Sequence, residues 1–100
     1  MRDFVLYPKA DKFLRKLKGK ELIKKFREMI SAICETPEIG DAKKGDLKGI
    51  LCVDIYHARV NYEIAYKVIE DDEEIICIIL LGVRENFYDD LKNYLRELDI

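Results

Sequence analysis

The hydrophobic period of this chain changes from helical to strand-like near its middle, and that change limits the folds it can form. Between residues 10 and 34 the apolar side chains recur every three or four positions, which is typical of amphipathic helices. Between residues 51 and 69 apolar and polar side chains alternate, which is typical of half-buried strands. Helices grouped beside a strand meander indicate an α+β domain.

Turn signals divide this pattern into seven elements. Phe4–Tyr7 predicts a short strand, and Pro8 suits the first turn of a helix that ends at Gly19. The second helix follows the apolar stripe 22–34 and ends before Pro37. Strands are expected at 51–57, 60–69 and 75–83, and a last helix at 87–98. The order β-α-α-β-β-β-α predicts a helical hairpin and a C-terminal helix packed, in two layers, on a mainly antiparallel four-stranded sheet.

Composition excludes several classes of protein. One hundred residues form a single domain, 1–100, and 49% apolar residues suffice for one core. The longest apolar run, Ile75–Val83, is far shorter than the roughly 20 residues of a membrane span, and the segment that starts Met1-Arg2-Asp3 lacks the apolar run of a signal peptide. We therefore expect a cytoplasmic protein without membrane contact. Three dispersed cysteines and one histidine disfavour zinc, so we expect reduced cysteines, no metal and no cofactor.

Charge is distributed unevenly. Residues 1–27 hold ten Lys or Arg and three acids, whereas the remaining residues hold eight and seventeen, although the net charge is only −2. A segregated basic end can meet an anionic partner. The simpler interpretation is that Lys-rich helices have solvated outer faces, and on charge alone we favour it.

The strand alternation places the candidates for chemistry on one face of the sheet. If Val60 and the residues alternating with it face the helices, the opposite face carries polar side chains. These are Asp54, Tyr56, Asn61, Glu63 and Lys67. Arg84 leaves the end of the central strand and Tyr88 follows one helical turn later, so both can converge on this face. The face is either a functional groove or a solvated sheet surface.

His57 is the only imidazole and therefore a candidate general base. It lies at a strand end in a tight connection, so a surface histidine is at least as good an interpretation. By alternation it shares a face with Ile55 and not with Tyr56. No P-loop, GxGxxG, GxSxG or HExxH motif is present.

Three segments together resemble one known family. They are Gly45–Gly49 (Gly-Asp-Leu-Lys-Gly), Asn61–Tyr66 (Asn-Tyr-Glu-Ile-Ala-Tyr) and Gly82–Tyr88 (Gly-Val-Arg-Glu-Asn-Phe-Tyr). Their order, with the β-α-α-β-β-β-α pattern, is similar to that of the RelE/ParE superfamily of bacterial toxins. The resemblance implies a type II toxin held inactive by a cognate antitoxin. RelE-like members enter the ribosome and cleave mRNA, whereas ParE-like members inhibit DNA gyrase without hydrolysis.

The resemblance also implies roles for two residues, and at three other positions this chain differs from RelE. In RelE-like ribonucleases the arginine matched by Arg84 stabilises the scissile phosphate, and the tyrosine matched by Tyr88 orients the 2′-hydroxyl or the phosphate. Lysines and an arginine of RelE are replaced here by Asp54, Tyr56 and Glu63. Either a carboxylate or His57 serves as the base, or an acidic groove repels RNA and the site has been lost. Further candidates are Asp46 as a carboxylate, and Lys48, Arg59 and Lys67 as phosphate-binding residues.

The expected function follows from this resemblance. It is a RelE-like, ribosome-dependent and metal-independent mRNA endoribonuclease, with the antitoxin, the ribosome and mRNA as partners. One alternative is a ParE-like inhibitor of DNA gyrase, and another is a catalytically degenerate toxin fold that only binds its antitoxin. Because one fold hosts both activities, the site has to distinguish them.

Overall fold

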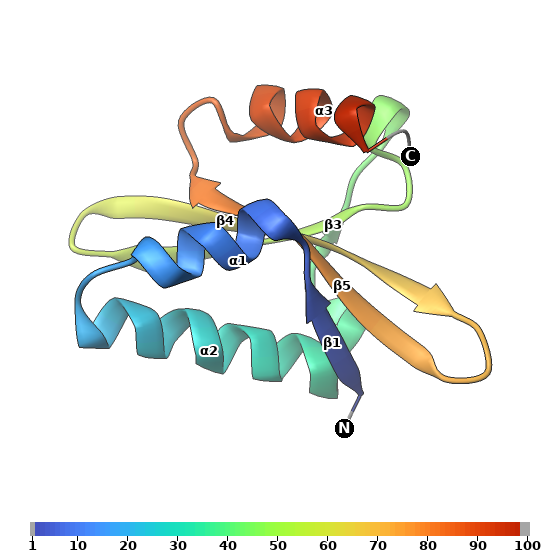
Figure 1. The fold of residues 1–100 in the computed structure, drawn as a ribbon, viewed down its shortest axis with the longest axis horizontal. Helices are drawn as coiled ribbons and strands as arrows, with labels where there is room; N and C mark the ends of the chain where they lie inside the picture. The colour runs from blue at the N-terminus through green and yellow to red at the C-terminus, as the bar shows by residue number, and fades with distance from the viewer. Residues whose placement is uncertain (1, 99–100) are drawn as a thin grey trace.

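A computed structural model describes residues 2–98, and within that range one mixed sheet separates helices on its two faces (Figure 1). The elements are β1 (Asp3–Leu6), α1 (Pro8–Lys16), α2 (Lys20–Glu35), β2 (Asp41–Ala42), β3 (Leu51–His57), β4 (Val60–Glu70), β5 (Glu74–Val83) and α3 (Phe87–Glu97). Single 3-10 turns at Pro37–Ile39 and Gly45–Leu47 flank β2. The α+β class and the seven predicted elements are confirmed.

The described strands follow the order β1-β5-β4-β3-β2, so the sheet has five strands and not four. The additional strand, β2, lies between the second helix and the strand predicted at 51–57, and it is too short for any alternation to reveal. β1 runs parallel to β5, and every other neighbouring pair is antiparallel. The central strand is β4, and β5 is the interior strand between β1 and β4. β5 is buried from Ile76 to Leu81, which agrees with its apolar sequence.

The layers differ from the prediction, because α3 covers the face opposite to α1 and α2 (Figure 1). One core joins α1 and α2 to the sheet and includes Phe26, Ile30, Ile64 and Tyr66. The other core joins α3 to the opposite face and includes Ala65, Ile79, Leu80, Phe87 and Leu91. The two-layer expectation is therefore wrong. Helix periodicity gives the apolar face of α3 but not the side of the sheet on which it packs.

A β-bulge in β5 enlarges the apolar surface on which α3 packs. Ala65 pairs with Leu80, whereas the next residue, Tyr66, pairs with Ile78, so Ile79 is the extra residue of β5. Both Ile79 and Leu80 then belong to the core beneath α3. The bulge breaks the alternation of the strand inside a run of apolar residues. Because this run contains no polar residue that would show which side chains share a face, the sequence does not reveal the bulge.

Tyr66 fixes the start of the loop that leads to β2. Its hydroxyl donates to the Pro37 carbonyl at 2.6 Å and accepts from the Gly40 amide at 2.9 Å. A Cβ at position 40 would collide with this hydroxyl, so the close approach requires glycine. The turn from Pro37 to Gly40 is thereby tied to β4.

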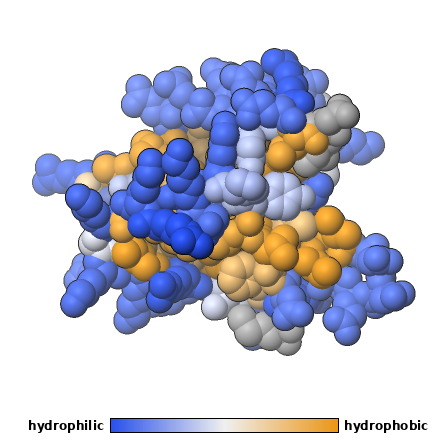
Figure 2. Space-filling view, in the orientation of Figure 1, coloured by the Kyte–Doolittle hydropathy of each residue, from blue (hydrophilic) through white to orange (hydrophobic). Residues whose placement is uncertain are grey.

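An apolar area of the surface lies over β1 and the adjoining end of β5 (Figure 2). Its exposed residues are Phe4, Val5 and Ile75. Within residues 2–98 no helix has the length and apolarity needed to cross a bilayer.

Candidate functional site

Polar side chains from five segments meet on the sheet face that carries α3. Asp54 of β3 lies directly opposite Glu63 of β4, and Glu63 lies opposite Gly82 of β5. Arg84 follows the end of β5, and Tyr88 lies in the first turn of α3. Lys43 enters from the chain just after β2. The alternation of the sequence correctly placed Asp54 and Glu63 on one face, away from Ile64 and Tyr66.

Glu63 occupies the centre of this cluster and is only 1% exposed. Its Oε1 lies 3.8 Å from Arg84 Nε, which is an ion-pair distance but too long for a hydrogen bond. Its Oε2 is buried without a hydrogen-bond partner among the described residues. Burial, followed by the adjacent Asp54 carboxylate, raises the pKa of Glu63 to about 8, although Arg84 and Lys43 oppose the shift. The carboxyl is therefore mostly protonated at neutral pH.

Backbone hydrogen bonds position Arg84 and leave its guanidinium accessible. The Arg84 amide donates to the Asn61 carbonyl at 2.8 Å, and the Arg84 carbonyl accepts from the Phe87 amide at 3.0 Å. Asn86, with φ +63°, turns the chain into α3. The Arg84 side chain remains 58% exposed, so it can contact Glu63 and an external anion.

Lys43 and Tyr88 form the second part of the cluster. Lys43 Nζ lies 5.1 Å from the centre of the Tyr88 ring, within cation–π range. The Tyr88 hydroxyl, as a hydrogen-bond partner, raises the pKa of Lys43. Burial raises the pKa of Tyr88 and outweighs the opposing effect of Lys43, so the phenol keeps its proton near neutrality. Two cations thus flank a carboxyl and a phenol.

Sequence reasoning missed Lys43, because β2, the strand just before it, has only two residues. The available signal was a lysine next to Asp41 and Ala42, which pair with the start of β3. Reasoning also gave no role to Cys52, which lies two residues before Asp54 on the same strand. Burial raises the pKa of the Cys52 thiol to about 12, so Cys52 is a packed apolar residue and not a nucleophile.

The structure separates His57 from this cluster. His57 ends β3 and by alternation shares the face of Ile55, which belongs to the α1–α2 core. Glu63 and Asp54 lie on the opposite face. His57 therefore does not lie with Arg84 and Tyr88. The alternation in the sequence had already predicted this separation.

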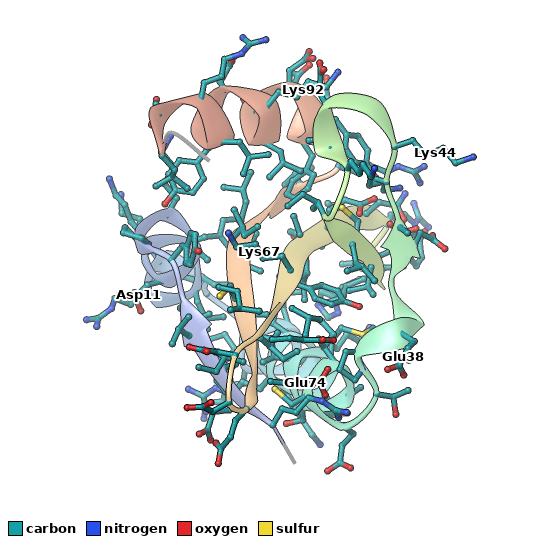
Figure 3. All side chains as sticks on the ribbon, turned by 90° about the vertical axis from the view of Figure 1, so that its right-hand side faces the viewer. Asp11, Glu38, Lys44, Lys67, Glu74 and Lys92 are labelled. Atoms are coloured by element: carbon teal, nitrogen blue, oxygen red, sulfur yellow. The ribbon has the colours of Figure 1, made fainter. Side chains whose placement is uncertain are left out.

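The remaining predicted cations lie around the cluster and not inside it. Arg59 lies in the β3–β4 turn with φ +66°, and Lys48 follows the second 3-10 turn, near Asp46. Lys67 lies on the face that α3 covers, four residues along β4 from Glu63, which is roughly 13 Å of strand (Figure 3). Lys67 Nζ lies 5.9 Å from the Tyr7 ring centre.

Comparisons with known proteins agree with this architecture. The free form of the toxin RelE from E. coli, in a mutant with two arginines replaced by alanine, aligns with a TM-score of 0.74 and 17% identity, covering 99% of this chain and 98% of RelE. The intact E. coli RelBE toxin–antitoxin complex aligns with a TM-score of 0.67 and 21% identity over 82% of this chain and 95% of the other. The RelBE2 complex of Mycobacterium tuberculosis gives 0.66 and 18% over 83% and 98%. At these identities the structures establish a shared toxin fold.

The family follows from the sequence model that matches the chain. A model described as the ParE-like toxin of type II bacterial toxin–antitoxin systems matches residues 4–92. The chain belongs to this family of toxins, and the resemblance to the RelE/ParE superfamily is confirmed. A sequence search of curated proteins finds no match.

Proposed function

We propose that the protein is a type II toxin that cleaves mRNA on the ribosome by attack of a ribose 2′-hydroxyl on the adjacent phosphate. The observation that carries this proposal is the buried Glu63 carboxyl, with a pKa near 8, held between Arg84 and the Asp54 carboxylate. A general base works best when its pKa is close to the operating pH. Where RelE has an arginine, this chain has Glu63. Because Glu63 is mostly protonated at pH 7, this difference does not make the site strongly anionic.

The proposed reaction uses three groups of the cluster. When the exposed Arg84 side chain moves from Glu63 to the phosphate, it uncovers the buried carboxylate. Ionised Glu63 then takes the proton of the 2′-hydroxyl while that oxygen bonds to phosphorus. Arg84 stabilises the negative charge that develops on the phosphoryl oxygens, for which its planar guanidinium is suited. Tyr88, adjacent to Lys43, gives its proton to the departing 5′-oxygen as the phosphorus–oxygen bond breaks. The products are a 2′,3′-cyclic phosphate and a 5′-hydroxyl.

Partners are proposed from the relatives and from charge. RelE proteins form complexes with RelB antitoxins, so we propose a comparable antitoxin for this chain. The basic segment 1–27, which includes α1 and much of α2, suits either an acidic antitoxin or ribosomal RNA. We propose that phosphates farther from the cleaved bond are bound by Lys48, Arg59 and Lys67. Because the proposed target is the ribosome, we also propose a cytoplasmic location.

A ParE-like inhibitor of DNA gyrase is the second candidate, because the matching family model bears the ParE-like description. Such an inhibitor needs no base or transition-state clamp. A degenerate toxin fold that only binds an antitoxin is the third. The three candidates are distinguished by measuring incorporation of labelled methionine and thymidine after the toxin is induced without antitoxin. For a ribonuclease, translation falls first, and for a gyrase inhibitor, DNA synthesis falls first. For a degenerate toxin, neither falls.

Arg84→Ala tests the ribonuclease directly. We expect it to abolish growth inhibition and mRNA cleavage while antitoxin binding remains, because the exposed guanidinium acts on the phosphate and contributes little to the fold. Arg96→Ala is the matched control, since Arg96 is an exposed arginine in the last turn of α3, outside the cluster and the basic segment 1–27, and it donates a hydrogen bond to Asn93. Full toxicity of Arg84→Ala would refute the assigned mechanism.

A further inference from the structure

Tyr56 is the most exposed of the large apolar side chains in residues 2–98, at 61%. It is not in a mobile loop but in β3, and its carbonyl accepts a hydrogen bond from Lys25 Nζ of α2 at 3.1 Å. A tyrosine on a strand has few rotatable bonds, so its ring is presented at low entropic cost. The ring is therefore a preformed flat surface next to the site.

The sheet register connects Tyr56 to Arg84 through one residue. Tyr56 lies directly opposite Asn61 on β4. The carbonyl of Asn61 accepts the hydrogen bond from the Arg84 amide at 2.8 Å. Tyr56, Asn61 and Arg84 thus lie side by side across three adjacent chain segments, spanning about 10 Å at the normal strand spacing. An exposed aromatic ring, an exposed amide and an exposed guanidinium follow one another along this line.

We propose that Tyr56 and Asn61 form a subsite for the nucleobase next to the phosphate held by Arg84. Aromatic rings stack on any base, because every base has a π-face. A side-chain amide carries both a donor and an acceptor, which suits it to distinguish base edges. This inference rests on the proposed ribonuclease function and adds the recognition of single-stranded RNA by stacking.

Binding of 2′-O-methyl oligoribonucleotides tests the subsite, because methylation blocks the attacking hydroxyl. Fluorescence anisotropy compares the wild type with Tyr56→Ala, Tyr56→Phe and Phe4→Ala. Phe4 is the matched control, an aromatic residue 44% exposed on the edge strand β1. We expect Tyr56→Ala to weaken binding by roughly 5- to 150-fold. Tyr56→Phe and Phe4→Ala should stay within about twofold of the wild type, since both keep a ring at position 56.

An oligonucleotide with one abasic position separates stacking from a change in fold. The abasic position is moved along the oligonucleotide one nucleotide at a time. At one position it should weaken binding by the wild type by about the same factor as the Tyr56→Ala substitution does. At that position it should not weaken binding by the Tyr56→Ala variant any further. Asn61→Ala should leave stacking intact but remove the base preference at that position in mapped cleavage sites. Equal losses for both proteins at every abasic position would overturn the subsite.

The outcomes also separate this inference from the proposed function. If Tyr56→Ala weakens antitoxin binding but leaves RNA binding unchanged, Tyr56 is a protein contact and the subsite is refuted. Absence of oligonucleotide binding by the wild type refutes it as well. In either case the labelling experiment and Arg84→Ala decide the ribonuclease function independently.

Discussion

At the scale of single residues, Glu63 has the most unusual environment within residues 2–98. It is buried, one of its oxygens has no hydrogen-bond partner among the described residues, and its nearest cation is 3.8 Å away. A protonated carboxyl tolerates burial much better than an ionised one, which is why its pKa rises. Arg84, Lys43 and Asp54 all face it, so the ionisation of Glu63 depends on the whole cluster.

This environment predicts that stability depends on pH through Glu63. Its pKa rises from 4.5 to about 8 on folding, so the native state holds a proton that the unfolded state has lost between these values. The free energy of unfolding therefore falls as pH rises through this window, by up to about 1.4 kcal/mol per pH unit. Glu63→Gln keeps the shape without titrating, so it should gain stability relative to the wild type as pH increases. Urea unfolding at pH 5, 7 and 9 measures this, and parallel curves for both proteins would contradict it.

At the scale of elements, the β3–β4 hairpin turns tightly with two strained residues. Ala58 and Arg59 have φ values of +50° and +66°, a combination typical of type I′ turns, where Asn and Gly are preferred. The left-handed region costs ordinary residues roughly 1–2 kcal/mol each. The turn nevertheless sets the register that places Tyr56 opposite Asn61 and Asp54 opposite Glu63. The hairpin thus bears strain next to the site.

Ala58→Asn should relieve part of that strain, because asparagine adopts the left-handed conformation more readily than alanine. We expect an increase of about 0.5–1 kcal/mol in the free energy of unfolding. Ala42→Asn is the control, an exposed alanine of β2 whose φ is not positive. Thermal and urea unfolding of both variants measure the effect. No gain for Ala58→Asn over Ala42→Asn would show that the turn is not strained in solution.

At the scale of the whole molecule, one sheet supports two separate cores. The α1–α2 core lies on one face, and the α3 core on the other face is continuous with the site through Tyr88. Figure 2 shows an apolar area over β1, which is the edge strand at the opposite end of the sheet from β2. The polar cluster and the apolar edge are therefore at different places on the same sheet.

Two matched truncations should separate these cores. Leu91→Ala in the α3 core and Ile30→Ala in the α1–α2 core each remove a buried side chain, at a cost of about 2–5 kcal/mol. Only Leu91→Ala should disturb the site, because α3 carries Tyr88. Amide chemical shifts of Arg84 and Tyr88 provide the measurement. Comparable shifts in both variants would mean that the cores are coupled through the sheet.

The sequence by itself determined the order and type of the elements and which strand residues share a face. These follow from local periodicity: alternation put Asp54 and Glu63 together and put His57 on the other side. The spacing of Arg84 and Tyr88 likewise predicted that both residues reach this face of the sheet, and the structure confirms that placement. Such inferences succeed because they depend on neighbours close in sequence.

Only the tertiary structure decided how these parts combine. The side on which α3 packs, the two-residue strand β2 and the bulge at Ile79 depend on contacts between distant segments, which periodicity does not encode. Lys43 joins the site through that short strand. The pKa of Glu63 also belongs to this level, because a carboxylate on a half-buried strand becomes a protonated acid only when α3, Arg84 and Asp54 enclose it.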